Sequence, residues 1–86
     1  MKLNRELVKR DIAGEVILVP VGKSVYDANG LFAINELGAF LWDRLEAAES
    51  EEDLLKAVLE EYEVTPAVAA ADLREFLEKL RAYGIL

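Results

Sequence analysis

The sequence predicts a small α+β domain in which a three-stranded antiparallel sheet is followed by three helices. The chain has 86 residues, of which 53% are hydrophobic and 31% charged, and this is typical of one globular unit with a single core. The first third is rich in β-branched residues and turn dipeptides. The rest repeats its apolar residues every three or four positions, which indicates helices. We therefore expect residues 1–86 to form a single domain.

The first two strands are expected to form a hairpin. Residues 7–12 mix apolar and charged side chains, whereas residues 15–21 are almost continuously apolar. Ala13-Gly14 separates the two runs and supplies the turn. The second strand is therefore expected to be partly buried.

A third strand is expected after a loop. The loop spans residues 22–30 and ends in Asn29-Gly30, which is a strong turn dipeptide. Four apolar residues follow without a charge or a proline: Leu31, Phe32, Ala33 and Ile34. If the three strands form a meander, the first and the third are the edges of the sheet.

Each of the three expected helices begins at a residue that favours the N-cap position, namely Asn35, Ser50 and Thr65. Gly84 is placed to end the last helix. Only two residues separate the second helix from the cap of the third, as in a helix–turn–helix. With the strands first, the order of elements is winged-helix-like.

The first helix carries one residue that disfavours helix formation. Leu37, Leu41 and Leu45 recur at helical spacing and form an apolar stripe. Gly38 lies beside this stripe and costs about 1 kcal/mol relative to alanine. We expect the glycine to allow close packing of a neighbouring element.

The residue inventory argues against catalysis. The chain has no cysteine and no histidine, which excludes thiol chemistry, disulfides and the usual zinc sites. Ser24, Ser50 and Thr65 are its aliphatic hydroxyl residues. We therefore expect no enzymatic activity and no cofactor or metal. The absence of cysteine, of a signal peptide and of an apolar run of about 20 residues favours a cytoplasmic protein that does not bind membranes.

Negative charge is concentrated in the first two expected helices. Residues 35–63 hold ten acidic side chains against two basic ones, within a chain whose net charge is −7. The acidic residues either form a solvated face or a docking patch for a basic partner. The last helix is neutral, with three basic and three acidic side chains. A helix–turn–helix raises DNA binding as a hypothesis, but phosphate contacts require a basic excess, so no nucleic-acid partner is expected.

The two expected edge strands differ in charge. The first carries Lys9, Arg10 and Asp11, which discourage unwanted strand pairing, whereas the third has no charge. An open edge beside a helix can accept a peptide as an additional strand. The last helix begins with small side chains over residues 67–71. These either leave a shallow groove beside the edge or simply favour helix formation and close packing.

Three segments resemble the PqqD-like family. They are the run from Leu31 to Trp42, the residues Glu60-Glu61-Tyr62 followed by Val64, and the ending from Ala71 to Leu86. The resemblance as a whole extends over nearly the entire chain, with the same order of elements. The resemblance implies a peptide chaperone that recognises the leader of a ribosomally made precursor peptide and presents it to a modifying enzyme, often a radical SAM protein. It also implies that the leader adds as a fourth strand to the third strand, against the last helix.

The predicted site therefore combines a strand with one face of a helix. Main-chain groups of Leu31, Phe32, Ala33 and Ile34 are expected to pair with the leader. Side chains of Ala67, Ala70, Ala71 and Arg74 are expected to line the groove, with Arg74 meeting an acidic leader residue. The alternative is a winged-helix regulator that binds another protein or DNA.

Overall fold

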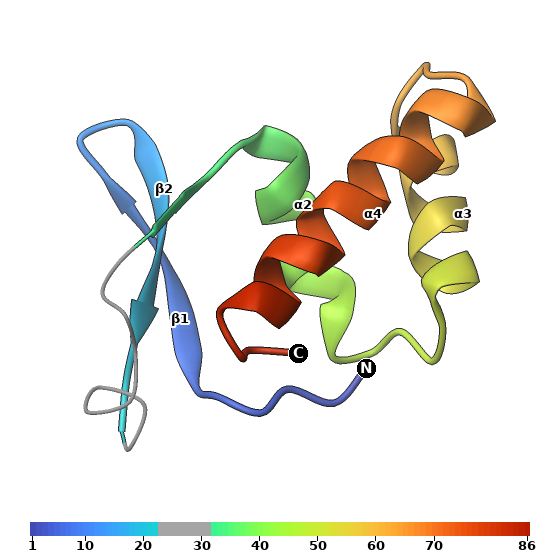
Figure 1. The fold of residues 1–86 in the computed structure, drawn as a ribbon. Coiled ribbons are helices and arrows are strands. Elements are labelled where there is room, and N and C mark those ends of the chain that lie inside the picture. The colour runs from blue at the N-terminus through green and yellow to red at the C-terminus, as the bar shows by residue number, and fades with distance from the viewer. Residues whose placement is uncertain (23–31) are drawn as a thin grey trace.

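The computed structural model describes residues 1–22 and 32–86, and its elements follow the predicted order (Figure 1). The elements are β1 (Leu7–Ile12), β2 (Glu15–Pro20), β3 (Phe32–Ile34), α2 (Glu36–Leu45), α3 (Glu51–Glu61) and α4 (Pro66–Ala82). The predicted α+β class is thus confirmed. The loop predicted over residues 22–30 lies outside the described residues from position 23 onward, as does Leu31 of the predicted third strand.

The sheet is an antiparallel meander in the order β1-β2-β3, as predicted. In the register of β2 with β3, Val16 lies opposite Ile34 and Ile17 lies opposite Ala33. Because side chains alternate along a strand, Val16 and Leu18 share one face with the paired Ile34. Leu18 is fully buried, so this face of the sheet packs against the helices.

All three predicted N-caps are confirmed. The side chains of Asn35, Ser50 and Thr65 each accept a hydrogen bond from the backbone N–H three residues further on, at 2.7, 3.3 and 3.3 Å respectively. Each bond satisfies one of the N–H groups that the first turn of a helix leaves without an intrahelical partner. After α4, Gly84 has the positive φ of +73° that a helix-ending glycine adopts.

The core lies mainly between the helices, and α4 is its centre. In Figure 1, α4 crosses the molecule with the sheet on one side and α3 on the other. The fully buried side chains come from every layer: Leu18, Leu41, Leu45, Leu54, Val58, Leu77, Leu80 and Ile85. The sheet contributes one of these eight, so helix packing supplies most of the apolar burial that stabilises the fold.

The N-terminal segment forms hydrogen bonds at the C-terminal end of α2 and just after the C-terminal end of α4. The backbone N–H of Asn4 donates to the carbonyl of Ile85 at 2.7 Å. The Met1 amine donates to the carbonyl of Leu45, at the end of α2, at 2.7 Å. The two ends of the chain consequently lie close together in Figure 1. In the part of the chain that the structure describes, no helix combines the length and the apolar character needed to span a bilayer.

The hairpin between β1 and β2 turns through two residues of left-handed conformation. Ala13 has φ +55° and Gly14 has φ +85°. Consecutive positive φ angles are typical of the type I′ turn, which favours Asn-Gly. Alanine disfavours this conformation because its Cβ crowds the following carbonyl oxygen.

We expect Ala13→Asn to raise the free energy of unfolding by about 1 kcal/mol, because asparagine tolerates the left-handed region. Chemical denaturation measures the change. Gly14→Ala is the matched control and should lower the free energy of unfolding by about 1 kcal/mol. A Cβ at position 14 would meet no atom within 4 Å, so backbone strain alone would account for that loss. If both variants match the parent protein, this turn is not left-handed in solution.

Candidate functional site

The candidate site begins at the outer edge of β3. This strand is hydrogen bonded to β2 on one side, and no strand within residues 1–22 and 32–86 pairs with its other side. Its residues, Phe32–Ile34, carry neither a charge nor a proline. By contrast, the opposite edge strand exposes Lys9, Arg10 and Asp11. The structure therefore leaves β3 as the edge without charges that discourage strand pairing.

A cleft of about 470 Å³ lies beside this edge. Three elements enclose it: β3, the start of α2 and the middle of α4. Figure 1 shows β3 leading directly into α2, with α4 passing alongside. The lining residues are Ala33, Ile34, Asn35, Leu37, Gly38, Asp72, Glu75, Phe76 and Lys79. The cleft thus combines an unpaired strand edge with one wall of a helix.

The floor of the cleft is apolar, and Gly38 sets its depth. A Cβ at position 38 would lie 3.2 Å from Ile34 Cβ and 3.2 Å from Phe76 Cε1. These separations are shorter than ordinary carbon–carbon contacts. An alanine at this position would require the Phe76 ring of α4 or the Ile34 side chain of β3 to shift by a few tenths of an ångström. The structure therefore confirms the close packing that the sequence predicts at this position.

The α4 wall of the cleft is charged. Asp72, Glu75 and Lys79 lie three and four residues apart, so they follow one strip of the helix surface. All three side chains are exposed, and none forms an ion pair or hydrogen bond with a described residue.

Some charged side chains elsewhere in the described residues have partners, although others, such as Arg74 and Lys56, have none among those residues. Lys9 Nζ lies 2.6 Å from Asp43 Oδ2, and Arg81 Nη2 lies 3.0 Å from Glu51 Oε1. The Arg44 guanidinium lies over the Phe40 ring, 3.6 Å from its centroid. The cleft therefore offers charges that the fold itself does not neutralise.

The strand part of the predicted site lies at this cleft. Ala33 and Ile34 line it, and Phe32 belongs to the same edge strand. Ala33 is exposed, and Ile34 is partly buried against the core. Leu31 lies outside the described residues. The structure thus places the edge strand β3 beside the last helix, α4, as the sequence predicts.

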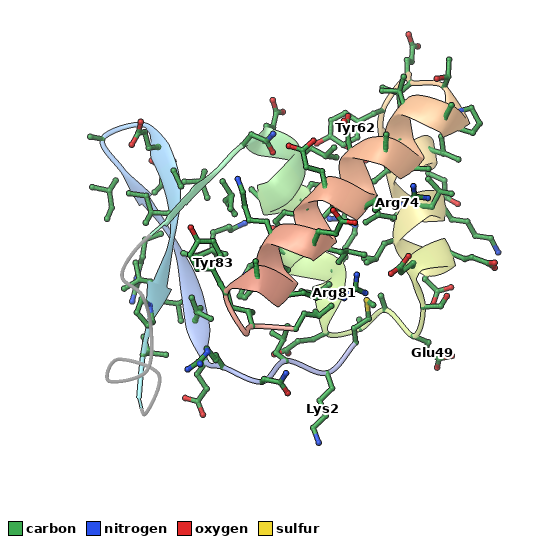
Figure 2. All side chains as sticks on the ribbon, viewed as in Figure 1. Lys2, Glu49, Tyr62, Arg74, Arg81 and Tyr83 are labelled. Atoms are coloured by element: carbon green, nitrogen blue, oxygen red, sulfur yellow. The ribbon has the colours of Figure 1, made fainter. Side chains whose placement is uncertain are left out.

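The helix part of the predicted site does not line this cleft, although Ala67 and Ala71 precede Glu75 in the same row of the α4 surface. Ala67, Ala70, Ala71 and Arg74 are absent from the cleft lining. Because successive residues rotate by about 100° around a helix, Ala70 and Arg74 point away from the strip of Asp72 and Lys79. In Figure 2, Arg74 projects from α4 on the side of α3. Ala67, Ala71 and Arg74 are exposed, and Ala70 is half-buried.

Four residues of α4 line the cleft but are not among the site residues predicted from the sequence. Asp72, Glu75, Phe76 and Lys79 stand at positions i, i+3, i+4 and i+7 of α4. Phe76 belongs to the buried stripe of this helix, and the charges of Asp72, Glu75 and Lys79 beside it mark the border between core and solvent. Val68 precedes Asp72 by one turn on the same strip and is 50% exposed. An exposed valine in line with three charges is the signal that could have identified this face.

The functional groups that line the cleft are of kinds that contact ligands. Its lining has carboxylates, one amine and one amide, without a hydroxyl, thiol or imidazole. Among the described residues, no group of three or more histidine, cysteine or acidic side chains could hold a metal ion. An open strand edge, an apolar floor and a charged wall are the elements of a peptide-binding site.

Comparisons with known proteins give a family and two similar folds. The family model for coenzyme PQQ synthesis protein D (PqqD) matches residues 15–86. TbiB1 in complex with the TbiA(beta) leader peptide is 27% identical, with a TM-score of 0.72 over 99% of this chain and 94% of that chain. Lasso peptide synthetase B1 complexed with a leader peptide is 23% identical, with a TM-score of 0.72 over 98% of this chain and 93% of that chain. No curated protein sequence matches the chain.

The contact at Gly38 yields a prediction about stability. We expect Gly38→Ala to lower the free energy of unfolding by about 1 kcal/mol. Crowding against Ile34 and Phe76 costs about 1–3 kcal/mol, and the better helix propensity of alanine returns about 1 kcal/mol. Chemical denaturation of both proteins measures the difference.

A double-mutant cycle with Phe76→Leu identifies the cause. Leucine has no atom at the Cε1 position. Gly38→Ala should therefore lower the free energy of unfolding by at least about 0.5 kcal/mol less in the Phe76→Leu protein than in the parent protein. If the two effects simply add, the ring does not restrict position 38, and the depth of the cleft has another origin.

Proposed function

The chain belongs to the PqqD family, and from this membership we propose that it binds the leader of a ribosomally made precursor peptide and presents it to a modifying enzyme. The observation that carries this proposal is the open edge of β3 beside a cleft whose opposite wall is α4. A leader that pairs with Phe32–Ile34 would become the fourth strand of the sheet. Its alternate side chains would then enter the cleft or face solvent.

The similar structure of TbiB1 supports a peptide as the ligand. That protein is in complex with the TbiA(beta) leader peptide, and the two folds agree over nearly the whole of both chains. In strand addition, the main-chain hydrogen bonds do not depend on the side chains of the peptide, and they require only an accessible strand edge. The cleft supplies the part that depends on side chains.

We propose a presenting role, with the chemistry performed by the partner enzyme. The cleft lacks the hydroxyl, thiol or imidazole that would serve as an activated nucleophile. Members of the family often act with radical SAM enzymes, and we propose such an enzyme as the partner, in the cytoplasm where precursor peptides are made. The exposed face of a bound leader would remain available to it.

The DNA-binding alternative has no support from the structure. In a helix–turn–helix, α4 would enter the major groove and would need basic side chains towards the phosphates. The exposed charges of α4 are instead balanced, with three acidic and three basic side chains: Asp72, Glu75, Glu78, Arg74, Lys79 and Arg81. The helix therefore lacks the basic excess that phosphate contacts require.

Amide hydrogen exchange tests the strand addition directly. The probe is a synthetic copy of the leader segment of a candidate precursor, a short reading frame to be sought beside the gene for this chain. We expect added protection at residues 32–34 and along residues 72–79, because new main-chain bonds and burial form there. The other edge strand, β1, serves as the internal control and should show no change. Protection confined to α3 would contradict strand addition at β3.

Paired tryptophan substitutions on α4 locate the helix side of the site. Glu75→Trp fills the cleft and should weaken leader binding at least tenfold, about 1.4 kcal/mol. Arg74→Trp adds the same side chain at an exposed position that points away from the cleft, and it should leave the affinity within twofold. Titration calorimetry measures both, and circular dichroism verifies the fold. The reverse result would place the groove at Ala67, Ala70, Ala71 and Arg74, as the sequence analysis expects.

A further inference from the structure

The charged wall of the cleft has a defined polarity. Its two carboxylates, Asp72 and Glu75, precede its one amine, Lys79, along α4. At 1.5 Å per residue, Asp72 and Glu75 lie about 4.5 Å apart along the helix axis, and Lys79 lies about 6 Å beyond Glu75. One end of the wall is therefore negative and the other end is positive.

This spacing matches the repeat of an extended peptide. Side chains on one face of a strand recur every two residues, at about 6.6–6.8 Å. The middle of the carboxylate pair lies about 8 Å from Lys79 along the axis. A flexible lysine or arginine side chain on the ligand spans the remaining difference.

The N-terminus of α2 does not reverse this polarity. A helix N-terminus attracts anions through its unpaired N–H groups. Here the N–H of Gly38 already donates to Asn35 Oδ1 at 2.7 Å. Glu36 also places a carboxylate in the first turn of the helix. The negative end of the α4 wall therefore remains the strongest charged feature at the cleft.

We propose that the cleft selects leader segments in which a basic side chain and an acidic side chain stand two residues apart on the same face. The basic side chain meets Asp72 and Glu75, and the acidic side chain meets Lys79. This inference rests on the proposed function and adds the sequence preference of its ligand. It moves the contact with an acidic leader residue from Arg74, which points away from the cleft, to Lys79.

A selection from displayed random 12-residue peptides tests the preference without knowledge of the natural leader. The protein is the bait, first as it is and then with the wall charges inverted by Asp72→Lys, Glu75→Lys and Lys79→Glu. We expect the parent protein to enrich a basic and an acidic residue two positions apart in a fixed order. The inverted protein should enrich the same pair in the opposite order, because strand pairing fixes the direction of the peptide.

Affinities of single peptides make the result quantitative. A peptide selected by the parent protein should bind the inverted protein about tenfold more weakly, since three exposed ion pairs are lost. Exchanging the two charges in the peptide should restore its affinity. Arg74→Glu is the matched control and should keep the preference of the parent protein, because this exposed residue lies outside the cleft.

Hydrogen exchange of β3 separates the possible failures. Selected peptides that protect residues 32–34 but show no charge preference would overturn this inference and leave the proposed function standing. Selected peptides that leave these amides unprotected, or no enrichment at all, would overturn both. A preference that Arg74→Glu reverses would return the acidic contact to Arg74.

Discussion

The contact of three elements at Gly38 is the constraint on which the rest of the site depends. The missing side chain lets the Phe76 ring of α4 and the Ile34 side chain of β3 approach the first turn of α2. Because β3 passes into α2 through the single cap residue Asn35, the strand edge and the floor of the cleft cannot move independently. The position of α4 against this floor then decides which of its side chains face a ligand.

Some surface charges of this protein connect neighbouring elements, whereas those of the cleft wall do not. Lys9 and Arg81 pair with carboxylates on neighbouring elements and hold those elements together at the surface. Each such exposed pair contributes at most about 1 kcal/mol. The charges of the cleft wall have no such partner among the described residues, so a ligand can neutralise them without breaking an existing contact. This is the condition under which charge complementarity gives specificity.

An uncharged edge strand normally promotes aggregation, and this fold limits that risk in two ways. The edge strand is short, with the three residues of β3, and short edges offer few main-chain groups. The charged wall of α4 also stands beside it, so an incoming strand must satisfy Asp72, Glu75 and Lys79 as well as the backbone. The short strand and the charged wall beside it therefore disfavour indiscriminate pairing.

The sequence by itself determined the parts of the protein that depend on neighbouring residues. The turn at Ala13-Gly14, the caps at Asn35 and Thr65 and the lack of charge in the third strand are local features, and each is present in the structure. The meander and the placement of a helix beside the open edge followed from these features and from the resemblance to a family.

Only the tertiary structure decided which face of α4 lines the site. The rotation of a helix about its own axis is set by the side chains that it buries, and here Phe76 enters the space above Gly38. That rotation carries Asp72 and Lys79 to the cleft and turns Arg74 away from it. Gly38 and Phe76 lie far apart in the chain, and the sequence does not state which residue fills the space above a glycine. The charges that line the cleft are therefore a consequence of packing and not of local sequence.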